Sequence, residues 1–211
     1  MKTTLVVLHG LSMNGDVMRQ KMQPLSVRLA ELLDLEFVDA PHACKEHTLA
    51  RLYAGARAVF RPAPPHLEWW NASDDGRAYN GYEASLELVR ERLAEHPRVA
   101  LLGFSQGATF AAALTALSER AELPKIRFAV MVAGRLPRST EWAPLFESSL
   151  RTPSLHVWGL RDRYATAASP GLLEGFAASS REAVFWRGPH VVPTKGVAAD
   201  AIVDFVRRQL S

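Results

Sequence analysis

The sequence predicts a single α/β domain spanning residues 1–211, with a mostly parallel sheet of about six strands covered by helices on both faces. Short apolar segments rich in β-branched residues alternate along the chain with longer helix-forming segments. The short segments are apolar at nearly every position, which is typical of strands buried on both faces of a parallel sheet. We find no internal repeat, low-complexity tract or linker, so the sequence predicts one domain.

The first half of the chain opens with a β-rich apolar run, and a second such run ends at Asp39. A helix-forming segment separates the two runs. Residues 41–78 are irregular and contain several prolines, which disfavour long elements. The expected elements of this half are a strand at 3–8, a helix within 16–33, a strand at 35–39, a helix at about 81–95 and a strand at 99–104.

The second half of the chain continues the alternation. A segment rich in alanine and leucine predicts a helix, and each apolar run after it predicts a strand. Residues 135–151 carry proline and tryptophan and interrupt the pattern. The expected elements are a helix at 106–120, strands at 127–133, 154–159 and 182–187, and helices at about 169–179 and 196–209.

The most informative motif is a G-x-S-x-G pentapeptide, Gly103 to Gly107, placed between an expected strand and an expected helix. This is the arrangement of a nucleophile elbow, in which a serine is held on a strained strand-to-helix turn. The two glycines leave room where a Cβ would collide with the turn. The first N–H groups of the following helix point at any oxyanion that forms on a bound acyl group. Ser105 is therefore the candidate nucleophile.

A serine nucleophile needs a histidine base that is oriented by a carboxylate. In α/β-hydrolases these follow in the order Ser, Asp/Glu, His, each after a strand. Asp162 lies in the turn after the strand expected at 154–159, and His190 lies in a Gly/Pro loop after the strand expected at 182–187. The sequence therefore predicts the triad Ser105, Asp162 and His190 in an α/β-hydrolase fold.

Other residues offer competing interpretations of this pattern. Asp162 is flanked by Arg161 and Arg163, as an exposed, ion-paired loop acid would be. Asp39 also ends a strand, but it precedes the serine and fits the chain order badly. His156 lies within an apolar strand, which favours a hydrogen-bonded core histidine.

The oxyanion hole needs two backbone donors in this fold. One comes from the residue after the serine, and the other comes from the loop after the first strand of the chain. We assign these N–H groups to Gln106 and Leu11. His9 precedes Leu11, and we expect it to brace this loop by hydrogen bonding.

Composition excludes several classes of partner. The formal net charge is +3, carried by scattered arginines without a basic block, so we expect no nucleic-acid partner. No apolar run is long enough to cross a membrane, and the opening apolar segment is too short for a signal peptide. No spacing of histidine, cysteine and carboxylate residues indicates a metal site. We expect neither a metal nor another cofactor.

The chain contains one cysteine, Cys44, which excludes an intramolecular disulfide and fits a reducing compartment. We therefore expect a cytoplasmic protein. No glycine pair or helix start presents Cys44 as a nucleophile. The oligomeric state does not follow from the sequence.

The combination of motifs resembles one family, the FSH1-type serine hydrolases, which include the OVCA2-like esterases of the α/β-hydrolase superfamily. The resemblance spans essentially the whole chain. Its matching pieces are Leu8-His9-Gly10-Leu11 with Asn14-Gly15, Asp39-Ala40-Pro41-His42, Trp69-Trp70, Tyr82-Glu83 with Ser85-Leu86, Gly103 to Ala108, Gly159 with Asp162, and Gly188 with His190, Val192 and Pro193. The resemblance implies hydrolysis of carboxylic esters or thioesters of small molecules without a cofactor, with Ser105, Asp162 and His190 as nucleophile, acid and base.

The chain departs from the family pattern at three positions. Leu11 replaces a usual aromatic residue, Pro189 replaces a glycine before the base, and Arg135 replaces a small or apolar residue. Arg135 follows the strand expected at 127–133, at the same sheet edge as Ser105. It is a candidate substrate-binding residue, with an ordinary surface arginine as the alternative.

Substrate choice stays open at this point. Residues 41–78 are long enough to roof the site but too short for a large lid domain. Trp69 and Trp70 either form an apolar wall for an acyl group or anchor this stretch to the core. An esterase and a thioesterase need the same triad, and a hydrolase fold can also serve as a non-catalytic binding or scaffold protein.

Overall fold

The computed structural model describes residues 1–54 and 61–211, and its centre is a six-stranded sheet in which every pairing is parallel. The strand order is β10-β9-β8-β7-β1-β2. The strands are β1 (Thr4–Leu8), β2 (Asp34–Val38), β7 (Val99–Phe104), β8 (Ile126–Val132), β9 (Ser154–Gly159) and β10 (Arg181–Trp186). The single-domain α/β fold predicted from the alternation is confirmed.

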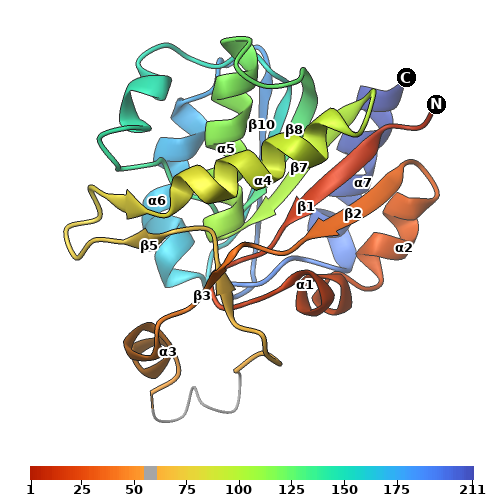
Figure 1. Cartoon of the computed structure of the whole chain (residues 1–211). Coiled ribbons are helices and arrows are strands. Elements are labelled where there is room, and N and C mark those ends of the chain that lie inside the picture. Colours follow the sequence, from red (N-terminus) through yellow and green to blue (C-terminus); the bar gives the residue numbers. More distant parts are fainter. Residues whose placement is uncertain (55–60) are drawn as a thin grey trace.

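Helices cover both faces of this sheet (Figure 1). One face carries the helices that follow β2, β7 and β9, and the other carries those after β1 and β10. The first group is α4 (Tyr82–Ala94), α5 (Gln106–Glu119) and α6 (Arg163–Glu174). The second group is α1 (Gly15–Lys21), α2 (Leu25–Ala30) and α7 (Gly196–Leu210). In the described part of the chain, no helix is long and apolar enough to span a membrane.

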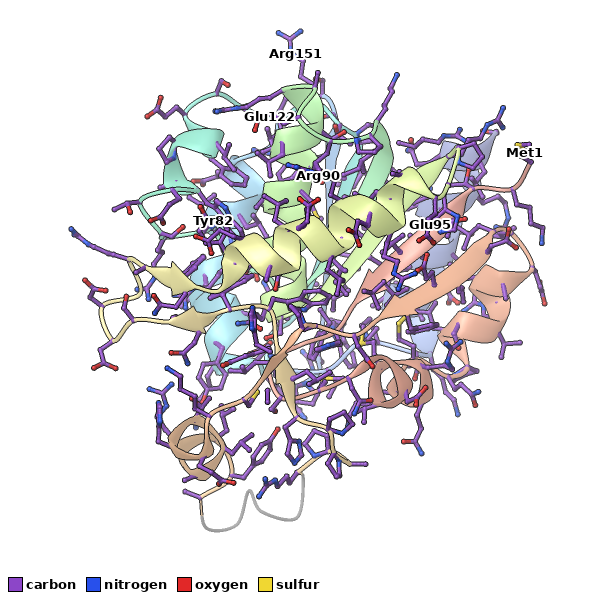
Figure 2. All side chains as sticks on the ribbon, viewed as in Figure 1. Met1, Tyr82, Arg90, Glu95, Glu122 and Arg151 are labelled. Carbon is purple, nitrogen blue, oxygen red and sulfur yellow. The ribbon has the colours of Figure 1, made fainter. Side chains whose placement is uncertain are left out.

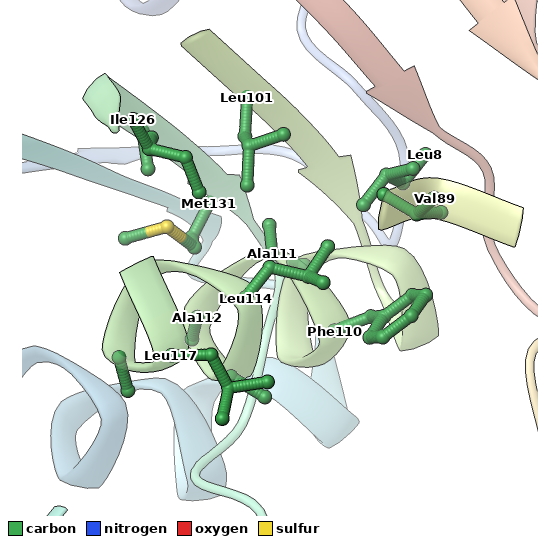
Figure 3. Close-up of a cluster of buried hydrophobic side chains, with 14 of the residues drawn as sticks. Leu8, Val89, Leu101, Phe110, Ala111, Ala112, Leu114, Leu117, Ile126 and Met131 are labelled. Carbon is green, nitrogen blue, oxygen red and sulfur yellow. The ribbon is translucent and has the colours of Figure 1, made fainter. Parts of the chain in front are cut away.

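Two hydrophobic cores lie on the two faces because successive strand residues point to opposite sides. In β7, Leu101 joins the core beneath α4 and α5, whereas Ala100 and Leu102 join the core beneath α1, α2 and α7. Helix α5 is buried along most of its length, and its Phe110 and Leu114 pack near Met131 of β8 and Val89 of α4 (Figure 3). This packing fixes α5 against the strand that precedes it.

Two helical segments differ from the sequence-based expectations. The helix expected within 16–33 is two helices, and the second begins after Pro24, which cannot donate a backbone hydrogen bond inside a helix. The helix expected at 169–179 is α6, which begins at Arg163 because the Asp162 side chain accepts hydrogen bonds from its first turn. Pro170 lies inside this helix.

The stretch expected to be irregular, residues 41–78, holds short elements in its described part. These are β3 (His42–Ala43) paired with β4 (Leu67–Glu68), α3 (Glu46–Leu52), and β5 (Asn71–Ala72) paired with β6 (Tyr79–Asn80). Residues 55–60 of the expected roof lie outside the described residues. Residues 135–151 contain one 3₁₀ turn, η2 (Ala143–Phe146).

The carboxyl ends of β1 and β7 lie side by side in the sheet. These neighbouring strands pair Leu8 with Gly103, but the chain leaves β1 toward one face and β7 toward the other. Loops that diverge in this way open a site at the switch point of a parallel sheet. The residues after Leu8 and after Phe104 therefore lie side by side there.

Candidate active site

Ser105 occupies a strained turn between β7 and α5. Its backbone has φ 55° and ψ −113°, a conformation that costs energy for a residue with a side chain. Glycines on either side make the turn possible. A Cβ on Gly103 would lie 2.2 Å from the Gly107 carbonyl oxygen, and one on Gly107 would lie 2.3 Å from the Leu8 carbonyl oxygen. The local geometry is that of a nucleophile elbow.

Ser105 and His190 lie in hydrogen-bond contact, with His190 Nε2 at 3.0 Å from Ser105 Oγ. The other ring nitrogen, Nδ1, lies 2.5 Å from Asp162 Oδ2. Asp162 is buried, with 2% of its surface exposed, whereas about a third (33%) of the His190 side chain is exposed. The structure thus brings together the three residues that the sequence singled out, in the order nucleophile, base and acid.

The second oxygen of Asp162 holds the amino end of α6. Oδ1 accepts hydrogen bonds from the backbone N–H groups of Tyr164 and Ala165, both at 3.0 Å. The Asp162 side chain is therefore fixed by the helix that it begins, with Oδ2 aimed at His190. The alternative of an exposed loop acid, paired with its arginine neighbours, does not fit this burial.

The loop that carries His190 packs tightly on the loop after β9. The N–H of Arg161 donates to the Gly188 carbonyl at 3.0 Å, and a Cβ on Gly159 would lie 2.1 Å from that same oxygen. The imidazole of His190 lies 5.0 Å from the Phe104 ring, centre to centre. Pro189 is accommodated in this loop while His190 contacts both partners.

Tyr164 is a neighbour of the base that the sequence analysis missed. Its ring centre lies 6.0 Å from that of His190, and 67% of its surface is exposed. Leu160 and Val191, on the two adjoining loops, also expose large apolar surfaces. In the sequence, these three residues lie within two positions of Asp162 or His190, and this proximity could have indicated that they surround the base. These side chains offer an apolar rim to a ligand at the base.

The two candidate oxyanion donors lie on the neighbouring loops after β1 and β7. Within residues 1–54 and 61–211, neither the N–H of Leu11 nor that of Gln106 donates a hydrogen bond. Both residues are partly exposed. The assignment of these N–H groups to an oxyanion hole stays a prediction.

His9 ties down the loop that carries Leu11. Its Nδ1 donates to the Gly10 carbonyl at 2.8 Å, and its Nε2 accepts from the N–H of Ala40 at 3.0 Å. Burial lowers the pKa of His9 to about 4, so the ring is neutral near pH 7 and can accept that hydrogen bond. The ring makes the bracing contacts expected from the sequence.

Trp69 and Trp70 are core side chains, with 0% and 4% of their surfaces exposed. The indole of Trp69 donates to the His9 carbonyl at 2.8 Å. Trp70 stacks on Tyr79, with ring centres 4.6 Å apart, and meets Trp142 edge-on. These contacts favour the anchoring role over the wall of an acyl pocket, because almost no indole surface is left for a substrate.

The Gln106 side chain fastens this anchored segment to the start of α5. Its Oε1 accepts from the N–H of Trp69 at 3.0 Å, and its Nε2 donates to the Trp70 carbonyl at 2.8 Å. The sequence predicts a role only for the backbone N–H of Gln106. Its side chain is a second link between residues 69–70 and the elbow.

The competing candidates lie apart from this hydrogen-bonded chain. Asp39 accepts from the N–H of Gly15 at 2.6 Å. His156 is buried in β9, where burial lowers its pKa to about 3. Burial, with the charge of Glu68 nearby, raises the pKa of Cys44 to about 12, which keeps it a thiol and a poor nucleophile.

Three potential metal ligands meet at the amino-terminal edge of the sheet. Among the described residues, Glu36, Glu95 and His96 bring ligand atoms within 4.8 Å of one another. His96 Nε2 already contacts Glu36 at 2.6 Å, and Arg92 lies 3.3 Å from Glu95 and 4.0 Å from Glu36. The positive charge of Arg92 disfavours a cation at this position.

Arg135 follows β8 at the carboxyl edge of the sheet, as expected. Its N–H donates to Thr109 Oγ1 at 3.2 Å, and the N–H of Thr109 donates to the Ser105 carbonyl at 3.1 Å. Thr109 was not singled out in the sequence. One side chain therefore separates the backbone of Arg135 from that of Ser105.

Comparisons with known proteins show the family of the chain and the likeness of its fold to solved structures. Residues 1–202 match the family described as "Serine hydrolase (FSH1)". The chain is 31% identical to the esterase OVCA2 of Danio rerio over 97% of this chain and 96% of that protein. Among solved structures, a carboxylesterase from Mesorhizobium loti aligns with a TM-score of 0.67 and 16% identity, over 98% of this chain and 89% of the other. The acyl-protein thioesterase 2 of Zea mays aligns with a TM-score of 0.63 and 22% identity, over 100% and 94%.

Proposed function

The chain belongs to the FSH1 serine hydrolase family, and on that premise we propose that it hydrolyses carboxylic esters of small molecules through an acyl-enzyme on Ser105. The observation that carries the proposal is the continuous contact from Ser105 Oγ through His190 to buried Asp162. The three side chains come from three separate loops that follow β7, β9 and β10. A hydrogen-bonded nucleophile, base and orienting acid is the constellation that serine hydrolysis needs.

In the first step, Ser105 Oγ attacks the ester carbonyl carbon while His190 Nε2 takes the hydroxyl proton. Asp162 stays ionised and stabilises the imidazolium that forms. The negative oxygen of the tetrahedral intermediate accepts hydrogen bonds from the N–H groups of Leu11 and Gln106, each worth on the order of 3 kcal/mol. No metal or organic cofactor enters this step.

The intermediate collapses when His190 returns its proton to the leaving alkoxide, which departs as the alcohol. The product is an ester between Ser105 and the acyl group. A water molecule then attacks this ester, with His190 taking one proton from it and returning a proton to Ser105. The acid is released and the serine is restored.

Thioester hydrolysis is the second candidate, because the same steps expel a thiol instead of an alcohol. Support comes from the fold likeness to the maize acyl-protein thioesterase, with a TM-score of 0.63 against 0.67 for the carboxylesterase. An acyl-length series of p-nitrophenyl esters and of acyl-CoA thioesters compares the two. We also propose a cytoplasmic location, which the single cysteine supports.

A fluorophosphonate probe tests the proposal directly, because it phosphonylates an activated serine. Mass spectrometry should find the adduct on Ser105 of the native protein and none on Ser105→Ala. The exposed Ser148→Ala variant is the matched control and should label as the native protein does. A folded native protein without an adduct would support a scaffold role instead. Ester turnover above a few per cent in pure Ser105→Ala would refute the nucleophile.

A further inference from the structure

Two arginines lie on the loop that follows β8, beside the candidate nucleophile. Arg135 is tied to Ser105 through Thr109, by hydrogen bonds of 3.2 Å and 3.1 Å. The same loop is fixed from the other side, since the N–H of Ser105 donates to the Val132 carbonyl at 2.8 Å. The backbone that presents Arg135 is therefore held in place against the elbow.

Arg138 is positioned by the hairpin of β5 and β6. Its N–H donates to the Tyr79 hydroxyl at 3.0 Å. Its guanidinium lies against Gly76, where a Cβ would be 2.0 Å from a guanidinium nitrogen. Gly76 has φ +71°, in the left-handed region that favours glycine, so the turn leaves the space that the arginine occupies.

Arg135 and Arg138 lie three positions apart on this loop, and both keep solvent-exposed surface. Burial and then the charge of Arg138 lower the pKa of Arg135 from its usual value. Within the described ranges, neither arginine has a carboxylate within 4.0 Å, although Arg28, Arg90 and Arg208 do. The nearby carboxylate of Asp75 accepts instead from the Ser73 hydroxyl at 2.6 Å and the Arg77 N–H at 3.0 Å.

Among the described residues, no carboxylate within 4.0 Å pairs with Arg135 or Arg138, so their N–H donors are available to an anionic ligand. Guanidinium groups bind carboxylate and phosphate oxygens through paired, charge-assisted hydrogen bonds. We propose that Arg135 and Arg138 form a subsite for a carboxylate or phosphate that a substrate carries away from its reacting carbonyl. The subsite deepens the proposed hydrolase function and rests on it. It gives the enzyme a preference for anionic esters or thioesters over neutral ones.

Matched substrate pairs test this preference in the full-length protein. The first pair is the p-nitrophenyl half-ester of glutarate, which carries a carboxylate, and p-nitrophenyl valerate, which is neutral. The second pair is butyryl-CoA, which carries phosphates, and S-butyryl-N-acetylcysteamine, which does not. Arg135→Ala should raise KM for the anionic member of one pair about tenfold more than for its neutral partner. The affected pair identifies the carboxylate or the phosphate as the ligand.

Two further variants sharpen this test. Arg135→Lys keeps the positive charge but lacks the planar guanidinium that binds an anion through two hydrogen bonds. It should therefore recover part of the lost preference for the anionic substrate. Arg151→Ala removes another exposed arginine, which precedes β9 at the opposite edge of the sheet and projects away from the molecule (Figure 2). It should leave both ratios as in the native protein. If Arg135→Ala changes KM equally for the anionic and the neutral substrate of each pair, or changes neither KM, the subsite is refuted. Arg135 and Arg138 are then ordinary solvated surface residues.

A binding measurement separates this inference from the proposed chemistry. Calorimetry with Ser105→Ala should show monomethyl glutarate or CoA binding about tenfold more tightly than to Ser105→Ala/Arg135→Ala. This difference would survive even if the native protein hydrolysed no ester, which would refute the proposed function alone. Ester turnover without charge discrimination, together with equal binding to the two variants, would refute the subsite alone.

Discussion

Asp162 contacts His190 through one carboxylate oxygen and caps helix α6 with the other. The helix therefore orients the acid, and the acid orients the imidazole through a contact of 2.5 Å. A single side chain links the stability of α6 to the geometry of the candidate triad. Substitutions that treat the two oxygens differently can separate these contributions.

Asp162→Asn should still cap helix α6 but should no longer orient His190 for catalysis. Asparagine keeps an oxygen acceptor for the amino end of α6, so unfolding in urea should change little. Its amide can donate to His190 Nδ1 and favour the wrong tautomer, which should lower kcat by about 10³- to 10⁴-fold. Asp162→Ala should lose similar activity and about 1 kcal/mol of stability. Asp39→Asn is the control and should keep the native kcat. If Asp39→Asn loses activity while Asp162→Asn keeps it, the acid is misassigned.

Three Gly→Ala variants should distinguish the effect of close packing on the free energy of unfolding from the effect of helix propensity. Gly103→Ala or Gly107→Ala would press a methyl group against backbone within 2.3 Å, so each should lose more than about 3 kcal/mol of unfolding free energy. Gly171→Ala in α6 has no neighbour within 4 Å and should gain up to about 1 kcal/mol. Thermal unfolding of the three variants measures this. If Gly107→Ala unfolds with the same free energy as the native protein, the close backbone contacts around Ser105 are contradicted.

Gln106→Ala should loosen the segment around Trp69 and Trp70. The N–H of Trp69 and the carbonyl of Trp70 would each lose a partner, at a cost of about 1–3 kcal/mol. Limited proteolysis should then cut near residues 67–80 faster than in the native protein. Gln106→Glu keeps the acceptor for Trp69 but turns an anion toward the Trp70 carbonyl, so it should not rescue the segment. Unchanged cleavage in both variants would mean that other contacts hold it.

His156 should make the protein less stable in mild acid. Its folded-state pKa is lowered to about 3, and the usual value is 6.5, so the unfolded chain binds the proton more tightly. Stability is then complete above pH 6.5 and falls as the pH drops toward 3, by about 2 kcal/mol between pH 7 and 5. His156→Leu should remove this share of the loss, as urea unfolding at both pH values can measure. His9 contributes in the same direction, so the variant should keep some acid sensitivity.

The parts of the fold that the sequence predicted depend on local patterns. Apolar runs located all six strands, and the pentapeptide around Ser105 located the elbow. The chain order of Ser105, Asp162 and His190 was informative because parallel strands bring their carboxyl ends to one edge. Short-range chemistry was enough for these features.

The features that the sequence did not predict depend on long-range contacts. The burial of Trp69 and Trp70 comes from residues as distant as His9 and Trp142, which no local pattern connects. Helix α6 begins at Arg163, earlier than the expected position 169, because the Asp162 side chain caps its first turn. The hydrogen bond from the N–H of Arg135 to Thr109 likewise depends on the fold of the loop after β8.

The candidate catalytic groups are distributed from the middle of the sheet to its edge. Ser105 follows β7, which has a strand on either side, whereas His190 follows β10, an outer strand whose residues are mostly half-exposed. Edge strands open more readily than central ones, and local opening needs less free energy than global unfolding. Fraying of β10 would carry the base away from the nucleophile while the rest of the sheet stayed intact. On heating, ester hydrolysis should therefore be lost at a temperature below the midpoint of global unfolding. The loss of activity would then report the local opening of β10.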